Sequence, residues 1–182
     1  MQTSTLALDL GCGRSPKNFF NADIVYGIDI QSLNESNIQK ADLAIENIPF
    51  ADNFFDYVTA HDFIEHVPRI LYLPSRSNSF VGRLKDLHSP KLIQRNPFVE
   101  LMNEIWRVLK PGGKFFSHTP AYPHPEVFRD PTHVNFITEH TFLLYFDDMH
   151  KWGMPYGFNG AFKVLSQEWE GPHLNTILLK PE

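Results

Sequence analysis

Two short apolar runs near the start of the chain each end in an aspartate, and a pair of glycines follows the first. The first run contains Asp9 and leads into Gly11 and Gly13, and the second, residues 24–28, leads into Asp29. Glycine has no Cβ, so the backbone of this turn can approach a ligand closely. A carboxylate can accept both hydroxyls of a ribose in charge-assisted hydrogen bonds. The spacing therefore predicts a nucleoside-containing ligand.

The elements that must position these residues follow from hydrophobic patterning. Short apolar runs bounded by turn residues predict strands, and apolar residues at helical spacing predict one amphipathic helix. We predict strands or extended segments at residues 5–10, 24–30, 41–50, 54–60, 114–117, 162–169 and 175–179, and a helix at 98–109 that ends at Lys110-Pro-Gly-Gly113. Only a turn or so of helix is expected between the first two strands, because Pro16 interrupts that segment.

The order of these elements predicts the fold class. Alternating strand and helix signals indicate an α/β fold with a doubly wound, mostly parallel seven-stranded sheet, whose last strand we expect to be antiparallel. Ligands of such sheets bind at the carboxyl ends of the strands. Asp9, Asp29, Asp42 and His61 all fall at or near such ends.

Composition narrows the class of protein. The 182 residues suit a single domain spanning residues 1–182, and the net charge of −5 argues against a broad nucleic-acid-binding surface. Cys12 is the only cysteine, so an intrachain disulfide and a cysteine-based zinc cluster are excluded. There is no basic leader and no apolar run near ~18 residues. We expect a cytoplasmic protein that contacts neither nucleic acid nor membrane, and the oligomeric state stays open.

Five sequence blocks, taken in order, resemble class I S-adenosylmethionine-dependent methyltransferases. They are Leu8-Asp-Leu-Gly-Cys-Gly13, Gly27-Ile-Asp29, the segment 48–58, Glu65-His66 and Arg107-Val-Leu-Lys-Pro-Gly-Gly-Lys114. The chain departs from the family where a third glycine is common, since Ser15 stands there. The helices that usually precede the first strand are also expected to be absent.

The resemblance implies S-adenosylmethionine as the cofactor and S-adenosylhomocysteine as its product. By position, it implies that Asp42 contacts the adenine amino group, that the backbone of Leu43 contacts the ring, and that His61 lies near the methionine part. For Asp9, direct contact with the cofactor and a structural role in holding the glycine turn remain equal alternatives. The expected cofactor-binding set is Asp9, Gly11, Cys12, Gly13, Asp29, Ile30, Asp42, Leu43 and His61.

Two segments are candidates for the substrate side. Residues 67–97 form a lid or insertion with an excess of basic residues, including Arg83, which suits phosphate or carboxylate groups or else a solvated loop. Residues 118–150 form a substrate-side loop with an Asp-Pro-Thr-His segment that is similar to one found over the active site in some methyltransferases of this class. We predict that Glu65, His66, Tyr122, His124 and Arg83 bind substrate, and that His133 or His118 assists an oxygen acceptor.

The predicted function is methyl transfer to a small polar or anionic acceptor, with a sugar or nucleotide-sugar hydroxyl as the preferred class. A catalytically silent cofactor-binding partner subunit is the alternative from another class. An NAD(P)-dependent oxidoreductase is disfavoured because Pro16 stands at the third fingerprint glycine. No metal site is predicted, since Asp147-Asp148 with His150 more simply indicates a polar helix end.

Overall fold

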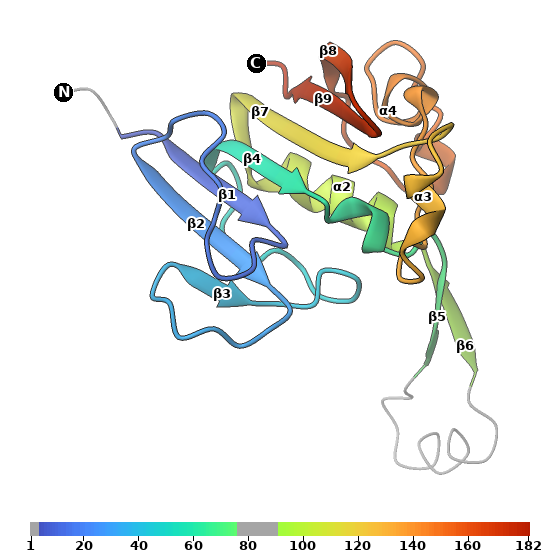
Figure 1. Cartoon of the computed structure of the whole chain (residues 1–182), viewed down its shortest axis with the longest axis horizontal. Helices are drawn as coiled ribbons and strands as arrows, with labels where there is room; N and C mark the ends of the chain where they lie inside the picture. The colour runs from blue at the N-terminus through green and yellow to red at the C-terminus, as the bar shows by residue number, and fades with distance from the viewer. Residues whose placement is uncertain (1–3, 76–90) are drawn as a thin grey trace.

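Seven strands form one sheet in the order β3-β2-β1-β4-β7-β9-β8 (Figure 1). The structure is a computed structural model that describes residues 4–75 and 91–182. The strands are β1 (Leu6–Leu10), β2 (Ile24–Asp29), β3 (Ile38–Lys40), β4 (Phe55–His61), β7 (Leu109–Pro120), β8 (Lys163–Glu170) and β9 (His173–Leu179). The first five strands in this order are mutually parallel, and β9 is antiparallel to both of its neighbours. The predicted sheet, with its antiparallel last strand, is confirmed.

Two predicted strand positions are corrected by the structure. The third strand ends at Lys40, and the segment predicted as extended, 41–50, forms turns in which the carbonyl of Asp42 accepts the N–H groups of Ile45 and Glu46. Asp42 also accepts the N–H of Ala44 through its side chain, so local bonds satisfy the backbone there without a partner strand. Strand β7 begins as soon as the helix ends, and the Lys-Pro-Gly-Gly residues lie within it, at an irregularity in its pairing with β4.

The main hydrophobic core lies on one face of the sheet. The predicted helix is confirmed as α2 (Pro97–Val108), which packs Leu101, Met102 and Ile105 against β4 and β7 residues such as Val58 and Phe115. The shorter helical elements are η1 (Ile64–His66), α3 (Glu126–Arg129), α4 (Glu139–Tyr145) and η2 (Met154–Tyr156). Among the described helices, none has both the length and the apolar character needed to span a membrane.

The opposite face of the sheet is covered by rings from the β1–β2 connection. The described residues 11–23 contain no helix, as expected from Pro16. Instead, Phe19 stacks on Phe116 with ring centroids 3.7 Å apart, and Phe20 stacks on Tyr57 at 4.5 Å. Two aromatic side chains thus cover β4 and β7 on this side.

The predicted insertion contains a two-stranded hairpin that projects away from the sheet (Figure 1). Its strands are β5 (Leu71–Pro74) and β6 (Leu92–Arg95), and residues 76–90 with Arg83 lie outside the described part of the chain. At its base, Arg69 donates to the side chain of Asn135 at 2.8 Å, and Arg95 pairs with Glu100. These two arginines therefore attach the hairpin to the domain.

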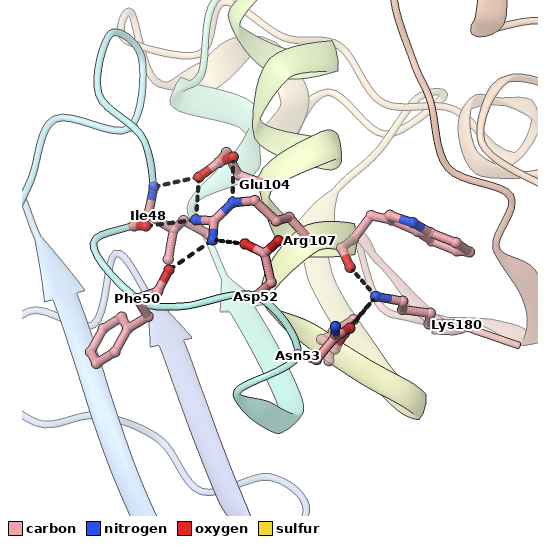
Figure 2. A network of polar contacts seen from close by, with 9 residues as sticks. Ile48, Phe50, Asp52, Asn53, Glu104, Arg107 and Lys180 are labelled. Atoms are coloured by element: carbon pink, nitrogen blue, oxygen red, sulfur yellow. Dashed lines mark hydrogen bonds and ion pairs between the residues drawn. The ribbon is translucent and has the colours of Figure 1, made fainter. Parts of the chain in front are cut away.

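A polar network joins the end of α2 to the turn before β4, at the amino ends of the parallel strands (Figure 2). Arg107 donates to the carbonyls of Ile48 and Phe50 at 2.8 Å and to the carboxylates of Glu104 and Asp52 at 2.7–2.8 Å. The carboxylates of Glu104 and, second, of Asp52 raise the pKa of Arg107 above its ordinary value. Nearby, Lys180 donates three bonds of 2.7–2.8 Å, to Asn53, Trp106 and Leu109.

Candidate functional site

Two glycines at and beside the turn after β1, Gly11 and Gly27, are packed so tightly that larger residues do not fit. Gly11 has φ of +65°, and a Cβ added to it would lie 2.4 Å from the ring of Phe63. On the neighbouring strand, a Cβ on Gly27 would lie 2.4 Å from the Sγ of Cys12. The backbone N–H of Cys12 donates to the carbonyl of Ile28 at 3.1 Å, which ties the turn to β2. The turn therefore has one fixed conformation at the carboxyl end of β1.

Asp9 lies beneath this turn with only 2% of its surface exposed. Its carboxylate accepts the backbone N–H of Lys17 at 2.8 Å and the hydroxyl of Thr59 at 2.7 Å, and it lies 3.4 Å from Nδ1 of His61. These bonds support the role of a structural acid that holds the glycine turn. Direct contact between Asp9 and a cofactor stays a prediction.

The Asp29 carboxylate stands at the end of β2, facing the same turn. One oxygen accepts the N–H of Gly13 and the other accepts the N–H of Gln31, both at 2.9 Å. A carboxylate oxygen has two lone-pair sites, so each oxygen can still accept a ribose hydroxyl. The side chain is half-buried, and the next residue, Ile30, is 60% exposed. The strand end thus presents an oriented carboxylate beside an open apolar side chain.

The other predicted cofactor residues lie around this edge of the sheet. Asp42 is half-buried in its turn, and the side chain of Leu43 is buried in the core, which leaves the backbone of Leu43 as its possible contact. The side chain of His61 is only 13% exposed, between Asp9 and the ring of Phe116. Burial, followed by the charges of Asp9 and Asp29, raises the pKa of Cys12 to about 12. These contacts to cofactor remain predictions.

A polar cavity of about 630 Å³ opens beside the turn, at the carboxyl ends of β4 and β7. Phe63 lies against Gly11, and Asp62 and Glu65, which are near Phe63 in the chain, line this cavity. Most of the side chains that line it are charged or titratable: Asp62, Glu65, Glu126, Asp130, His66, His133, His173 and Arg129. The cavity is therefore adjacent to the predicted cofactor turn.

Asn135 explains how the Asp-Pro-Thr-His segment reaches this cavity. It is fully buried, its backbone N–H donates to the carbonyl of Glu65, and its amide donates to the carbonyl of Ile64 at 2.9 Å. Its amide oxygen also accepts the bond from Arg69. A single buried amide thus joins the loop, the short helix η1 and the hairpin base, and it places His133 opposite Glu65.

Three predicted residues, Glu65, His66 and His133, meet in the cavity. Glu65 is 1% exposed, and one of its oxygens, Oε2, accepts the hydroxyl of Thr119 at 2.8 Å. The other oxygen, Oε1, is buried and has no hydrogen-bond partner within residues 4–75 and 91–182. Burial raises the pKa of this carboxyl above its ordinary value. A buried acceptor with a free lone pair is uncommon in proteins and indicates a functional position.

Hydrogen bonds at Nδ1 determine which nitrogen of each imidazole is available. Nδ1 of His133 lies 3.0 Å from the carbonyl of Val127, and because a carbonyl only accepts, Nδ1 carries the proton. Nδ1 of His66 lies 3.3 Å from the carbonyl of Thr132 and therefore donates as well. In the neutral rings, Nε2 of both histidines is left as an acceptor.

The candidate base His118 and the predicted substrate residues Tyr122 and His124 do not themselves line the cavity. Nδ1 of His118 is 2.6 Å from the side-chain oxygen of Asn175, and its ring stacks on His173 with centroids 4.2 Å apart. Tyr122 is 56% exposed, and His124 packs near Trp169. Of the residues the structure describes, these three predicted ones are not part of the cavity lining.

Sequence reasoning missed Asp62 and His173, which line the same cavity. Nε2 of His173 lies 3.0 Å from a carboxylate oxygen of Asp62. Asp62 directly follows His61, which could have suggested it, but His173 is brought there only by its pairing opposite Pro120. By contrast, Asp147 accepts the N–H groups of Met149 and His150 in a local turn, as expected for a polar helix end.

Comparisons with known proteins agree with this geometry. Residues 8–76 match the methyltransferase domain family. No curated protein matches the chain. An S-adenosylmethionine-dependent methyltransferase from Archaeoglobus fulgidus is 16% identical, with a TM-score of 0.58 over 97% of this chain and 86% of that one. A second, from Mesorhizobium loti, is 16% identical, with a TM-score of 0.55 over 97% of this chain and 91% of that one.

A third similar structure is that of a protein named for a different activity. The [4+2]-cyclase SpnF is 15% identical, with a TM-score of 0.58 over 98% of this chain and 75% of that one. At these identities the similarity shows the fold alone. The fold and the domain match together confirm the resemblance to class I methyltransferases and imply S-adenosylmethionine as the cofactor.

Proposed function

We propose that this chain, a methyltransferase domain with the class I fold, transfers the methyl group of S-adenosylmethionine to an oxygen of a small polar acceptor. One observation carries the proposal. The cavity lined by Glu65, His66 and His133 lies close to the glycine turn, because Phe63 lies against Gly11 and its chain neighbour Asp62 lines the cavity. A cofactor held through Asp29 at that turn and an acceptor held in the cavity would lie side by side.

Methyl transfer from a sulfonium is an in-line displacement, so holding the acceptor close and aligned supplies much of the rate. A hydroxyl acceptor also gains from a base. His133 suits that role, because its Nδ1 is bonded to the carbonyl of Val127 and its Nε2 remains an acceptor. His118 is the second candidate base. His118 does not line the cavity and its Nδ1 is bonded to Asn175, so we assign it the smaller contribution.

The cavity lining favours a neutral acceptor rich in hydroxyls over an anion. Among the described residues, four carboxylates line it, those of Asp62, Glu65, Glu126 and Asp130, against one arginine, Arg129. Carboxylates accept hydrogen bonds from hydroxyls and repel anions. A sugar hydroxyl is therefore the acceptor class that we propose. We also propose a cytoplasmic location, where the lone thiol of Cys12 would stay reduced.

Calorimetric titration tests the cofactor assignment. S-adenosylhomocysteine and S-adenosylmethionine should bind, NADH should not, and Asp29→Ala should weaken binding by roughly a hundredfold or more because two charge-assisted bonds are lost. Glu35→Ala, which removes an exposed acid, is the matched control. The absence of binding by both sulfur compounds, or normal binding by Asp29→Ala, would contradict the assignment.

A panel of sugars and nucleotide sugars then tests catalysis. Turnover should depend on His133, with His133→Ala lowering kcat by about a hundredfold or more. Unchanged turnover in both His133→Ala and His118→Ala would exclude the base role.

The second candidate function is a cofactor-binding protein that does not transfer methyl groups, favoured by the fold shared with the cyclase SpnF. Binding of S-adenosylhomocysteine without turnover of any acceptor would support this candidate.

A further inference from the structure

The three groups that meet in the cavity have the composition and placement of metal ligands. One ligand atom from each of Glu65, His66 and His133 lies within 4.8 Å of the other two. Two neutral imidazoles and one carboxylate form the ligand set of many catalytic zinc sites, which keep a further coordination position open. From this juxtaposition we infer that Glu65, His66 and His133 bind a divalent transition-metal ion such as Zn²⁺ in the cavity.

The second shell of each ligand supports this inference. Metal-binding histidines usually donate their other N–H to a carbonyl or carboxylate, which orients the ring. His133 donates to the carbonyl of Val127 and His66 to the carbonyl of Thr132, so Nε2 of each ring is the nitrogen that remains for an ion. The hydroxyl of Thr132 lies 3.0 Å from the same Nδ1 of His66 and itself donates to Asp130.

Glu65 provides an independent observation. Its Oε2 is oriented by the hydroxyl of Thr119, while its Oε1 is buried and without a partner among the described residues. Leaving a buried carboxylate oxygen unsatisfied is costly, and a cation beside it would remove that cost. Glu65 lines the cavity together with His66 and His133, and one of its carboxylate oxygens lies within 4.8 Å of a ring nitrogen of each histidine.

The distances require only a small closure. Ligand atoms about 2.1 Å from a tetrahedral ion are about 3.4 Å apart, so the three atoms would approach one another by up to about 1.4 Å. His66 is exposed and can move toward the ion, whereas Glu65 is held by the buried core around it. The open position of the ion would then face the cavity.

An ion at this site would also act in the reaction that we propose. It would lower the pKa of an acceptor hydroxyl, and in that state His133 is a ligand and not a base. This consequence rests on the proposed function, but the binding of the ion does not.

Titration of the tag-free, chelator-treated chain with Zn²⁺ tests the site. We expect one equivalent to bind in calorimetry, and Co²⁺ to give the visible absorption bands of a bound ion. His133→Ala, His66→Ala and Glu65→Gln should each weaken Zn²⁺ binding at least about tenfold. Thr132→Val, which removes only an exposed hydroxyl beside His66, should weaken binding by about tenfold. His140→Ala removes an exposed histidine outside the cavity and should bind normally.

Two results would overturn the inference: no saturable binding, or binding that survives His133→Ala. In the second case, the His173→Ala variant would also be titrated, and loss of binding in it would place the ion at the second candidate triad, Asp62, His118 and His173. Circular dichroism of each variant verifies folding, and Thr132→Val gives a test that leaves the core intact. S-adenosylhomocysteine titrations of the same samples separate failure of this site from failure of the proposed function.

Discussion

The two polar clusters at opposite ends of the parallel strands differ in how their hydrogen-bonding groups are used. At the amino ends, Arg107 directs its guanidinium at two carbonyls and two carboxylates, and Lys180 donates three bonds (Figure 2). At the carboxyl ends, Glu65 keeps a buried oxygen without a partner among the described residues, and His133 keeps a free acceptor nitrogen. Saturated polar groups stabilise a fold, whereas unsaturated ones are available to a ligand.

The largest expected effect is on the rate at which the thiol of Cys12 is labelled, and it tests how the polar groups at the carboxyl ends of the strands are held. Cys12 lies in the glycine turn, and its thiol pKa of about 12, against an ordinary 9.0, leaves roughly a thousandfold less thiolate at pH 8. Iodoacetamide should therefore label the folded chain several hundredfold more slowly than the urea-unfolded chain. Its rate should still rise with each pH increment above 9. Equal labelling rates at pH 8 would show that the thiol is not held as described.

Arg107→Met should destabilise the fold more than any other change considered. It leaves two carbonyls and two carboxylates without their charged donor, so the free energy of unfolding should fall by about 3 kcal/mol. Urea denaturation measures this, with Arg14→Met, an exposed arginine, as control. The affinity of the folded fraction for the cofactor should stay unchanged. A loss of cofactor affinity without a loss of stability would contradict the assignment of the amino-end cluster to stability and of the carboxyl-end cluster to ligand binding.

Lys180→Met should have a smaller effect of the same kind. Lys180 is 9% exposed, and burial lowers its pKa below the ordinary value, which shows that desolvation offsets part of the gain from its three bonds. We expect a loss of about 2 kcal/mol, mainly from the two carbonyls left unpaired. Lys163→Met, at an exposed position of β8, is the control in the same denaturation experiment. Equal stabilities of the two variants would remove Lys180 from the stabilising network.

Glu65→Gln should have the smallest effect on stability and the opposite sign. The amide keeps an acceptor for Thr119 and removes the cost of a buried, partly unsatisfied carboxyl, so the free energy of unfolding should stay equal or rise by up to about 1 kcal/mol. A thermal melt without added metal measures it, with Glu168→Gln at an exposed position as control. A decrease of more than about 2 kcal/mol in the free energy of unfolding would show that Glu65 stabilises the fold, as Arg107 and Lys180 are expected to do.

Much of the expected cofactor-binding region could be predicted from the sequence, because its residues are close to one another along the chain. Gly11, Gly13 and Asp29 are separated by few residues, and parallel pairing of adjacent strands brings their ends together. The third strand was placed too late because the hydrogen bonds of Asp42 to its own turn resemble no periodic pattern. Hydrophobic patterning detects periodic burial. It does not detect turns whose backbone groups are hydrogen-bonded within the turn.

The acceptor side could be predicted only in part. The sequence singled out Glu65, His66 and His133 separately, but the distance between Glu65 and His133 along the chain is closed by Asn135, a buried amide with no recognisable motif. It also grouped them with Tyr122 and His124, which the structure places elsewhere. The antiparallel partner of β7 then brought in His173, which no spacing rule indicates.

The sequence by itself determined the class of sheet and the glycine turn, since these follow from hydrophobic periodicity and short-range spacing. It indicated the cofactor through the resemblance of its five sequence blocks to class I methyltransferases. Only the tertiary structure decided which polar groups meet and which of them stay unsatisfied. Whether a side chain has a partner depends on long-range packing. That distinction separates Arg107, whose N–H groups all have acceptors, from Glu65, whose buried Oε1 has no partner among the described residues.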